Sequence, residues 1–127
     1  MELKFYLCKH CGNVVEMVVD RGVPILCCGE KMHLLAPNTT DAAGEKHVPV
    51  VTVMGSTVKV SVGSVTHPME EKHHIAFIAL ETKHGVQRRE LHPDEAPEAV
   101  FALAEGDEAV AAYEYCNLHG LWKSEIK

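Results

Sequence analysis

Apolar and polar residues alternate along much of the chain, and this pattern favours β-strands over helices. The clearest case is Thr57–Val62, where three valines alternate with polar residues and give the strand one inward face. His74–Thr82 is a nearly continuous apolar run, as expected of a strand buried on both faces. Turn residues follow at 83–85, and Val86–Leu91 is then predicted to return as the partner strand.

Shorter apolar segments follow in the last third of the chain. Val100–Ala104 and Ala109–Tyr115 are separated by the turn residues 105–108, which predicts another hairpin between them. Trp122–Ile126 is predicted to be a closing strand. About seven short strands with regular turn signals predict a mostly β protein whose main domain, residues 45–127, is a β-sandwich.

The first 36 residues have a different character. Three short strands are predicted here, with a turn at Asp20-Arg21-Gly22 between the last two: Lys4–Leu7, Val14–Val19 and Val23–Leu26. A module of this length cannot bury a sufficient core by itself, and metals or oligomerisation usually make up the deficit. Small and turn-forming residues at 37–44 then predict a linker. The expected organisation is a small domain at 1–36, a linker at 37–44 and the larger domain at 45–127.

Composition and charge narrow the possible functions. The chain has 127 residues, of which 46% are hydrophobic and 24% are charged, as in ordinary globular proteins. A net charge of −6 argues against nucleic-acid binding, which usually needs a basic patch. No apolar stretch approaches the ~18 residues of a membrane span, and the first residues lack the pattern of a secretory signal. A cytoplasmic protein without nucleic-acid or membrane partners is therefore expected.

Four of the five cysteines, Cys8, Cys11, Cys27 and Cys28, lie in the small domain. An odd total without a secretory signal favours metal thiolates over disulfides. The first pair has the two-residue gap of a metal knuckle, whereas the second pair is adjacent. Adjacent cysteines in an extended chain point to opposite sides, so the backbone must bend there, and Gly29 would permit the bend. On spacing alone, a structural zinc knuckle and a rubredoxin-like iron site remain equally open.

The fifth cysteine belongs to one of three unusual motifs that also contain four histidines. The motifs are EKHVP at 45–49, HPMEEKH at 67–73 and CNLHGLW at 116–122. Neutral imidazoles and a thiolate suit iron, copper or zinc, but five protein ligands are too many for structural zinc, which almost always has four. A six-coordinate iron with five protein ligands would keep one position for a small ligand.

These motifs resemble those of the superoxide reductases, and with the N-terminal cysteines nearly the whole chain resembles their two-iron form, the desulfoferrodoxins. The resemblance implies a desulforedoxin-like first domain, an immunoglobulin-like sandwich and a homodimer. It favours iron over zinc at Cys8, Cys11, Cys27 and Cys28, although zinc could replace it in recombinant material. It also implies a second iron bound by His47, His67, His73, His119 and Cys116, with the cysteine opposite the open position. The neighbouring His74 is predicted to lie outside the site.

The chemistry that the resemblance implies is one-electron reduction of superoxide to hydrogen peroxide, with electrons from a rubredoxin-like donor. Ferrous iron with one thiolate and four neutral imidazoles carries a net positive charge, which attracts a small anion locally although the protein is acidic. Lys46 is predicted to guide the anion and to hydrogen-bond it. Oxidation raises the positive charge further, so Glu45 is predicted to bind the oxidised site.

Two other functions compete with this prediction. The first is an iron-binding electron-transfer or storage module without a substrate, but an electron carrier would ideally have saturated iron. The second is superoxide dismutation, which requires the oxidised metal to accept an electron from superoxide. A thiolate ligand and a Glu45 cap disfavour that half-reaction, so reduction of superoxide remains the preferred prediction.

Overall fold

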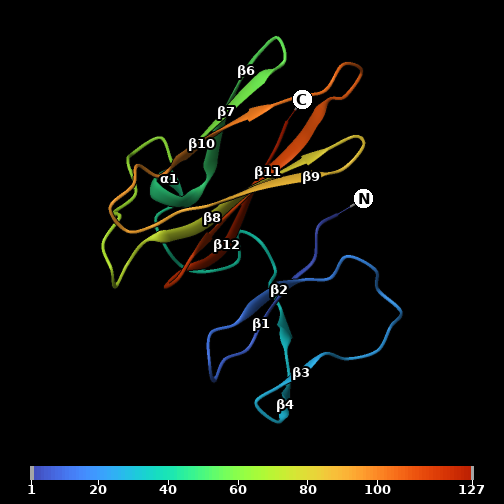
Figure 1. Ribbon diagram of the computed structural model, residues 1–127. Coiled ribbons are helices and arrows are strands. Elements are labelled where there is room, and N and C mark those ends of the chain that lie inside the picture. Colours follow the sequence, from blue (N-terminus) through green and yellow to red (C-terminus); the bar gives the residue numbers. More distant parts are fainter. Residues whose placement is uncertain (1, 127) are drawn as a thin grey trace. The chain divides into compact units, whose positions relative to one another are not determined.

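The computed structural model describes residues 2–126, and the chain divides between Ala36 and Pro37 into two units (Figure 1). We call them the N-terminal unit and the sandwich unit. The strands of the N-terminal unit are short: β1 (Phe5–Leu7), β2 (Val14–Glu16), β3 (Leu26–Cys27), β4 (Glu30–Lys31) and β5 (His33–Leu34). They form a three-stranded antiparallel sheet in the order β2-β1-β5 and a separate hairpin of β3 and β4. No strand here exceeds three residues, so regular sheet accounts for little of this unit.

The two strands predicted on either side of Asp20-Arg21-Gly22 are shorter than expected and do not pair with each other. Strand β2 pairs with β1 and stops at Glu16, while β3 pairs with β4. Between them the chain is a loop, in which Asp20 accepts hydrogen bonds from the backbone N–H of Gly22 (2.8 Å) and from Lys4 Nζ (3.0 Å). Pro24 also lacks the N–H that a strand at this place would need.

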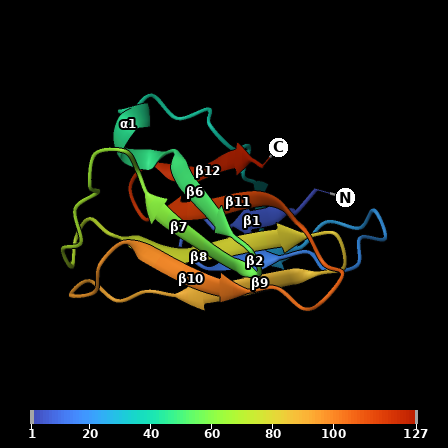
Figure 2. The ribbon, with the colours of Figure 1, turned by 90° about the horizontal axis from the view of Figure 1, so that it is seen from above.

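Residues 37–126 of the sandwich unit contain one short helix and seven strands. These are α1 (Gly44–His47), β6 (Pro49–Met54), β7 (Thr57–Val62), β8 (Ile75–Thr82), β9 (Val86–Glu90), β10 (Glu98–Ala102), β11 (Ala109–Cys116) and β12 (Gly120–Glu125). One sheet has the order β10-β7-β6 and the other the order β12-β11-β8-β9, all antiparallel. Figure 2 shows the strands from above, with α1 beside one end of them. The predicted seven-stranded sandwich is confirmed.

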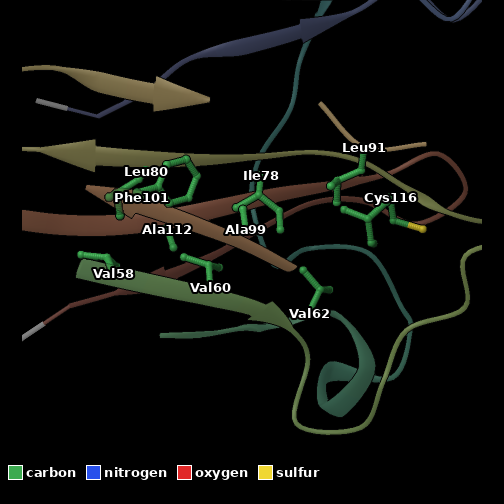
Figure 3. Packing of buried hydrophobic residues seen from close by; sticks show 11 residues of the cluster. Val58, Val60, Val62, Ile78, Leu80, Leu91, Ala99, Phe101, Ala112 and Cys116 are labelled. Atoms are coloured by element: carbon green, nitrogen blue, oxygen red, sulfur yellow. The ribbon is translucent and has the colours of Figure 1, made fainter. Parts of the chain in front are cut away.

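The core lies between the two sheets, as the alternating pattern requires. Val58, Val60 and Val62 of β7 are at most 1% exposed, and they pack with residues of β8, β10 and β11. Burial of each such side chain stabilises the fold by roughly 1.5–3 kcal/mol. Cys116 is the last member of this cluster on β11, and its sulfur is directed away from the other labelled side chains (Figure 3). The end of the hydrophobic core thus holds a potential metal ligand.

The predicted hairpin of Val100–Ala104 with Ala109–Tyr115 is wrong. Strand β10 pairs with β7, whereas β11 pairs with β8 and β12, so the connection between β10 and β11 passes from one sheet to the other. Asp107 in this connection accepts hydrogen bonds from the Thr82 hydroxyl (2.8 Å) and the His84 N–H (3.1 Å), which ties it to the β8–β9 turn. Local turn signals do not reveal which sheet a strand joins.

Helix α1 was not predicted, since the sequence from residue 45 onward indicated strands. It is a single turn, with a hydrogen bond from the Val48 N–H to the Gly44 carbonyl (2.8 Å). It brings Glu45, Lys46 and His47 to one end of the sandwich (Figure 2). Among residues 2–126, the helical structure is too short and too polar for a membrane-spanning helix.

The segment 37–43, predicted as a linker, contacts β12. The backbone N–H of Asn38 donates to the Leu121 carbonyl (3.0 Å). The side-chain amide of Asn38 donates to the Lys123 carbonyl (3.1 Å) and accepts from the Lys123 N–H (2.8 Å). A single asparagine therefore pairs with β12 as a neighbouring strand would.

Candidate metal centres

The four cysteines of the N-terminal unit come together in one cluster, which we call the four-cysteine cluster. Their Sγ atoms all lie within 4.8 Å of one another. Cys8 and Cys11 belong to the turn after β1, Cys27 ends β3, and Cys28 begins the β3–β4 turn. The sulfurs of Cys11 and Cys27 are 3.6 Å apart, and none of the four forms a disulfide.

The adjacent cysteines converge because the backbone bends between β3 and β4. Cys27 pairs with Glu30 across a two-residue loop, in which Cys28 has φ +53° and Gly29 has φ +76°. Positive φ at both loop residues is the signature of a type I′ hairpin turn. The expected bend is therefore confirmed, although Cys28 itself adopts the left-handed conformation together with Gly29.

The charge state of the four-cysteine cluster fits a bound cation. The backbone N–H of Cys11 lowers the pKa of Cys8 to about 6, which favours a thiolate there. Hydrogen bonds with Cys8 and Cys11 raise the pKa of Cys28 to about 12, because its thiolate would face other thiolates. Four thiolates at this spacing repel one another unless a metal ion binds them. Four converging sulfurs suit iron or zinc.

The second cluster, which we call the histidine–cysteine cluster, gathers side chains from four places in the sandwich unit. His47 ends α1, His67 and His73 lie in the loop between β7 and β8, Cys116 ends β11, and His119 lies in the turn before β12. The first four offer ligand atoms within 4.8 Å of one another. His119 Nδ1 lies 3.2 Å from His47 Nε2 and 3.9 Å from Cys116 Sγ. All five predicted ligands therefore meet at one point.

Hydrogen bonds fix which imidazole nitrogens face the cluster. His47 Nδ1 donates to the Ala43 carbonyl (2.8 Å), and His67 Nδ1 donates to the Pro68 carbonyl (2.6 Å). Their Nε2 atoms then carry bare lone pairs, yet these atoms lie only 3.2 Å apart. His73 Nε2 is buried and has no hydrogen-bond partner among the described residues. Lone pairs converging on one point are unfavourable unless a cation occupies it, so the donor set fits a metal.

Burial keeps these histidines neutral, which is the form that binds metals. Desolvation lowers the pKa values of His47 and His73, and it lowers that of His67 to about 4. Burial raises the pKa of the Cys116 thiol, while the backbone N–H groups of Leu118 and His119 lower it. The His119 N–H lies 3.4 Å from the sulfur. These two N–H groups stabilise a thiolate at a buried position.

Two residues that the sequence did not assign to the site support it. The Trp122 ring stacks on the His47 ring, with centroids 5.0 Å apart, and its Nε1 donates to the His119 carbonyl (3.1 Å). Gly63 lies so close to α1 that a Cβ there would be 2.6 Å from the Glu45 carbonyl oxygen. Trp122 is the last residue of the third motif, which hinted at its involvement, but no local signal identified Gly63.

The charged residues predicted to assist, Glu45 and Lys46, are both exposed on α1. The ammonium group of Lys46 contributes to lowering the pKa values of His47 and His73, so its positive charge acts on the cluster. The Glu45 main-chain carbonyl accepts hydrogen bonds from the Val65 N–H (2.9 Å) and the Ser64 hydroxyl (3.2 Å). These bonds hold the β7–β8 loop against α1.

His74 contacts the loop beside it instead of the cluster. Its Nδ1 lies 3.1 Å from the carbonyl oxygens of both Glu70 and Glu71. Of these two adjacent residues before β8, His73 belongs to the cluster and His74 does not.

Comparison with known proteins agrees with this geometry. The desulfoferrodoxin family model matches residues 39–125. The desulfoferrodoxin of Syntrophotalea carbinolica is 49% identical over 124 residues, covering 98% of this chain and 97% of that protein. The crystal structure of the superoxide reductase from Treponema pallidum superposes with a TM-score of 0.84 at 45% identity, covering 98% of this chain and all of that one. The superoxide reductase of Pyrococcus horikoshii is 38% identical over 104 residues, covering 68% of this chain and 90% of that protein. The chain therefore belongs to the desulfoferrodoxin family.

Proposed function

We propose that this chain is a superoxide reductase. In this reaction superoxide gains one electron and two protons and becomes hydrogen peroxide. The observation that carries the proposal is the meeting of His47, His67, His73, His119 and Cys116 at one buried point, with bare imidazole lone pairs facing inward. A relative named superoxide reductase, with a closely similar structure over the full chain, supports the same activity.

The five side chains of the histidine–cysteine cluster are proposed to bind iron. Bound iron would supply the electron and one exchangeable position for a small anion. Burial raises the pKa of Cys116, and two backbone N–H groups partly offset this; as a thiolate, Cys116 would donate electron density to the bound iron. His47 and His67 are kept in one tautomer by their carbonyl partners. The protein thus fixes the ligand geometry before the substrate arrives.

Lys46 is proposed to attract superoxide to the site. Its ammonium group is exposed on α1, next to the ligand His47, and its charge acts on two ligand histidines. A cation in this place raises the local concentration of a small anion although the protein carries a net charge of −6. Glu45, one residue earlier on the same turn, is proposed to bind the site after oxidation.

The four-cysteine cluster is proposed to bind a second iron and to exchange electrons with a rubredoxin-like donor. Cys11 and Cys28 are exposed, so a partner protein can approach these sulfurs closely. Thiolate sites also accept zinc, which would bind but could not carry an electron. Electron transfer without a substrate, the competing function for the whole chain, is therefore proposed only for the N-terminal unit.

Homodimer formation is proposed to involve the N-terminal unit. Five of its apolar side chains are more than half exposed: Val18, Val19, Val23, Leu26 and Leu34. Exposed apolar residues in a unit with so small a core indicate a protein interface. Sedimentation equilibrium should show a dimer, and a stable monomer at micromolar concentration would refute the proposal.

The five free cysteines favour a reducing compartment, and we infer the cytoplasm.

The stoichiometry of the reaction tests the proposed activity. Superoxide pulses applied to the prereduced protein should yield one hydrogen peroxide per oxidised histidine–cysteine site and no dioxygen. Dismutation would instead give dioxygen together with half as much peroxide per superoxide. A pure electron-transfer module would leave superoxide to decay at its uncatalysed rate.

A further inference from the structure

Asn117 follows the ligand Cys116 directly, and its side chain reaches the loop that carries another ligand, His73. The Asn117 Oδ1 accepts a hydrogen bond from the His74 N–H (2.8 Å), and its Nδ2 donates to the Lys72 carbonyl (2.9 Å). These two groups belong to the residues on either side of His73. The backbone N–H of Asn117 also donates to the His74 carbonyl (3.2 Å). One residue therefore connects two metal-ligand segments that are 43 positions apart in the sequence.

The need for such a residue follows from where the sheet pairing ends. From Ala111 to Tyr115, strand β11 pairs regularly with β8, and the register then shifts so that Cys116 faces Ile75. Beyond this point the chain turns toward His119, and its main chain leaves the sheet. The planar carboxamide of Asn117 offers one acceptor and one donor, as the backbone of a paired strand would.

The loop at 68–73 needs this support because its other hydrogen bonds are local. Glu70 and His73 form a two-hydrogen-bond bridge within the loop (2.9 and 3.1 Å). Met69 packs against the core, and its sulfur accepts the Ile75 N–H (3.3 Å). None of these hydrogen bonds reaches the Cys116 turn. The buried Nε2 of His73 has no protein partner among the described residues, so its position depends on the backbone that carries it.

We propose that Asn117 is a positioning residue that holds His73 in register with Cys116 and so sets the affinity of the histidine–cysteine cluster for its metal. It acts through the Lys72 carbonyl and the His74 N–H, not by touching the metal or the substrate. Residues that orient metal ligands typically change metal affinity or activity by 10- to 100-fold when they are replaced. The inference depends on the proposed function only in assuming that this cluster binds iron.

The test compares Asn117→Ala and Asn117→Asp with the wild-type protein. Alanine removes both side-chain hydrogen bonds, whereas aspartate keeps the acceptor and loses the donor to Lys72. Added negative charge near a metal cation favours retention of the metal, so faster release from the aspartate variant must come from the lost donor. We expect a ferrous chelator to remove iron from the histidine–cysteine cluster roughly 10- to 100-fold faster in the alanine variant, with an intermediate rate for aspartate. The absorption and EPR signatures of this iron should also shift.

Asn38 provides the matched control. Its carboxamide makes the same pair of hydrogen bonds, to the Lys123 N–H and carbonyl, but residues on either side of Lys123 are not ligands. Because Asn38 has φ +62°, Asn38→Asp is the suitable variant, since aspartate tolerates this conformation better than alanine. We expect it to lower stability as much as Asn117→Asp without changing iron release.

The possible outcomes separate this inference from the proposed function. If the wild-type cluster binds no iron, the proposed function fails. If the wild type holds iron and the Asn117 variants release it at the wild-type rate with unchanged spectra, Asn117 has no positioning role. If Asn117→Ala does not fold, the comparison of Asn117→Asp with Asn38→Asp decides: equal release rates in the two overturn the inference, and faster release from Asn117→Asp supports it.

Discussion

The two clusters are held in place by different kinds of structure. The four-cysteine cluster lies in a unit whose strands have two or three residues, and two of its sulfur-bearing residues are exposed. The histidine–cysteine cluster lies at the end of a sandwich, where Cys116 belongs to the hydrophobic core and His47 and His67 are at most 2% exposed. A metal bound to the first cluster would contribute to folding, whereas in the second the fold itself brings the ligands together.

This difference explains how each cluster gathers its ligands. The cysteines come from two short turns, so the local backbone conformation, including the left-handed Cys28, is enough to bring them together. The histidines and Cys116 come from four elements spread over more than seventy residues. They meet because the two sheets pack on a common core. Small changes in that packing should therefore affect the second site and leave the first unchanged.

The largest effect on activity is expected from Cys116→Ser. A hydroxyl is a hard, mostly protonated ligand and cannot replace the thiolate, so superoxide reduction should be abolished. The sulfur-to-iron charge-transfer band of this site should disappear, while the absorption of the four-cysteine iron stays unchanged. Activity at the wild-type level would contradict the assigned role of Cys116. Loss of both irons would contradict the independence of the two clusters.

Replacing both Cys27 and Cys28 with serine tests whether the histidine–cysteine cluster works without the four-cysteine cluster. Metal binding to a small thiolate site contributes on the order of 10 kcal/mol to folding, so the N-terminal unit should lose its structure together with its iron. The sandwich unit has its own core and should keep its iron. A rapid-mixing experiment on the prereduced variant should still show conversion of superoxide to peroxide in a single turnover. If the second iron stayed bound but this fast reaction were lost, our assignment of all the chemistry to the histidine–cysteine cluster would be wrong.

Gly63→Ala probes the packing that positions His47. A Cβ at this residue would lie 2.6 Å from the Glu45 carbonyl oxygen and 2.9 Å from the Lys46 carbonyl carbon, and these main-chain atoms must then move. We expect a loss of about 1–3 kcal/mol in the free energy of unfolding of the sandwich unit, together with faster iron release from its cluster. Gly85→Ala is the control, because its Cβ would meet nothing within 4 Å. Equal stabilities of the two variants in denaturant titrations would refute this role for Gly63.

The smallest effect is expected from Lys46→Ala, which should slow superoxide capture roughly several-fold while both irons stay bound. Salt screens the attraction between a cation and an anion. The wild-type rate should therefore fall with ionic strength, and the rate of the variant should fall less. Lys59→Ala removes the same charge from β7 and serves as the control. Parallel salt dependences of the wild type and Lys46→Ala would show that Lys46 does not guide the substrate.

The sequence determined the parts of this protein whose information is local. Alternating valines identified β7 and its buried face, and the three motifs identified all five side chains that meet in the second cluster. The HPMEEKH motif, which ends at His73, also favoured His73 over His74 as the ligand. The buried face of β7 follows from the alternation of side chains along a strand, whereas the five ligands were identified by the resemblance of the motifs to those of superoxide reductases.

Tertiary structure alone decided which distant segments lie side by side. The turn residues between β10 and β11 predicted a hairpin, but each strand joined a different sheet, because strands pair where the apolar faces of both sheets can be buried. The close contact of Gly63 with α1, the stacking of Trp122 on His47 and the hydrogen bonds of Asn117 on both sides of His73 likewise join residues far apart in the chain. Such contacts depend on how the elements pack, and no local pattern encodes that packing.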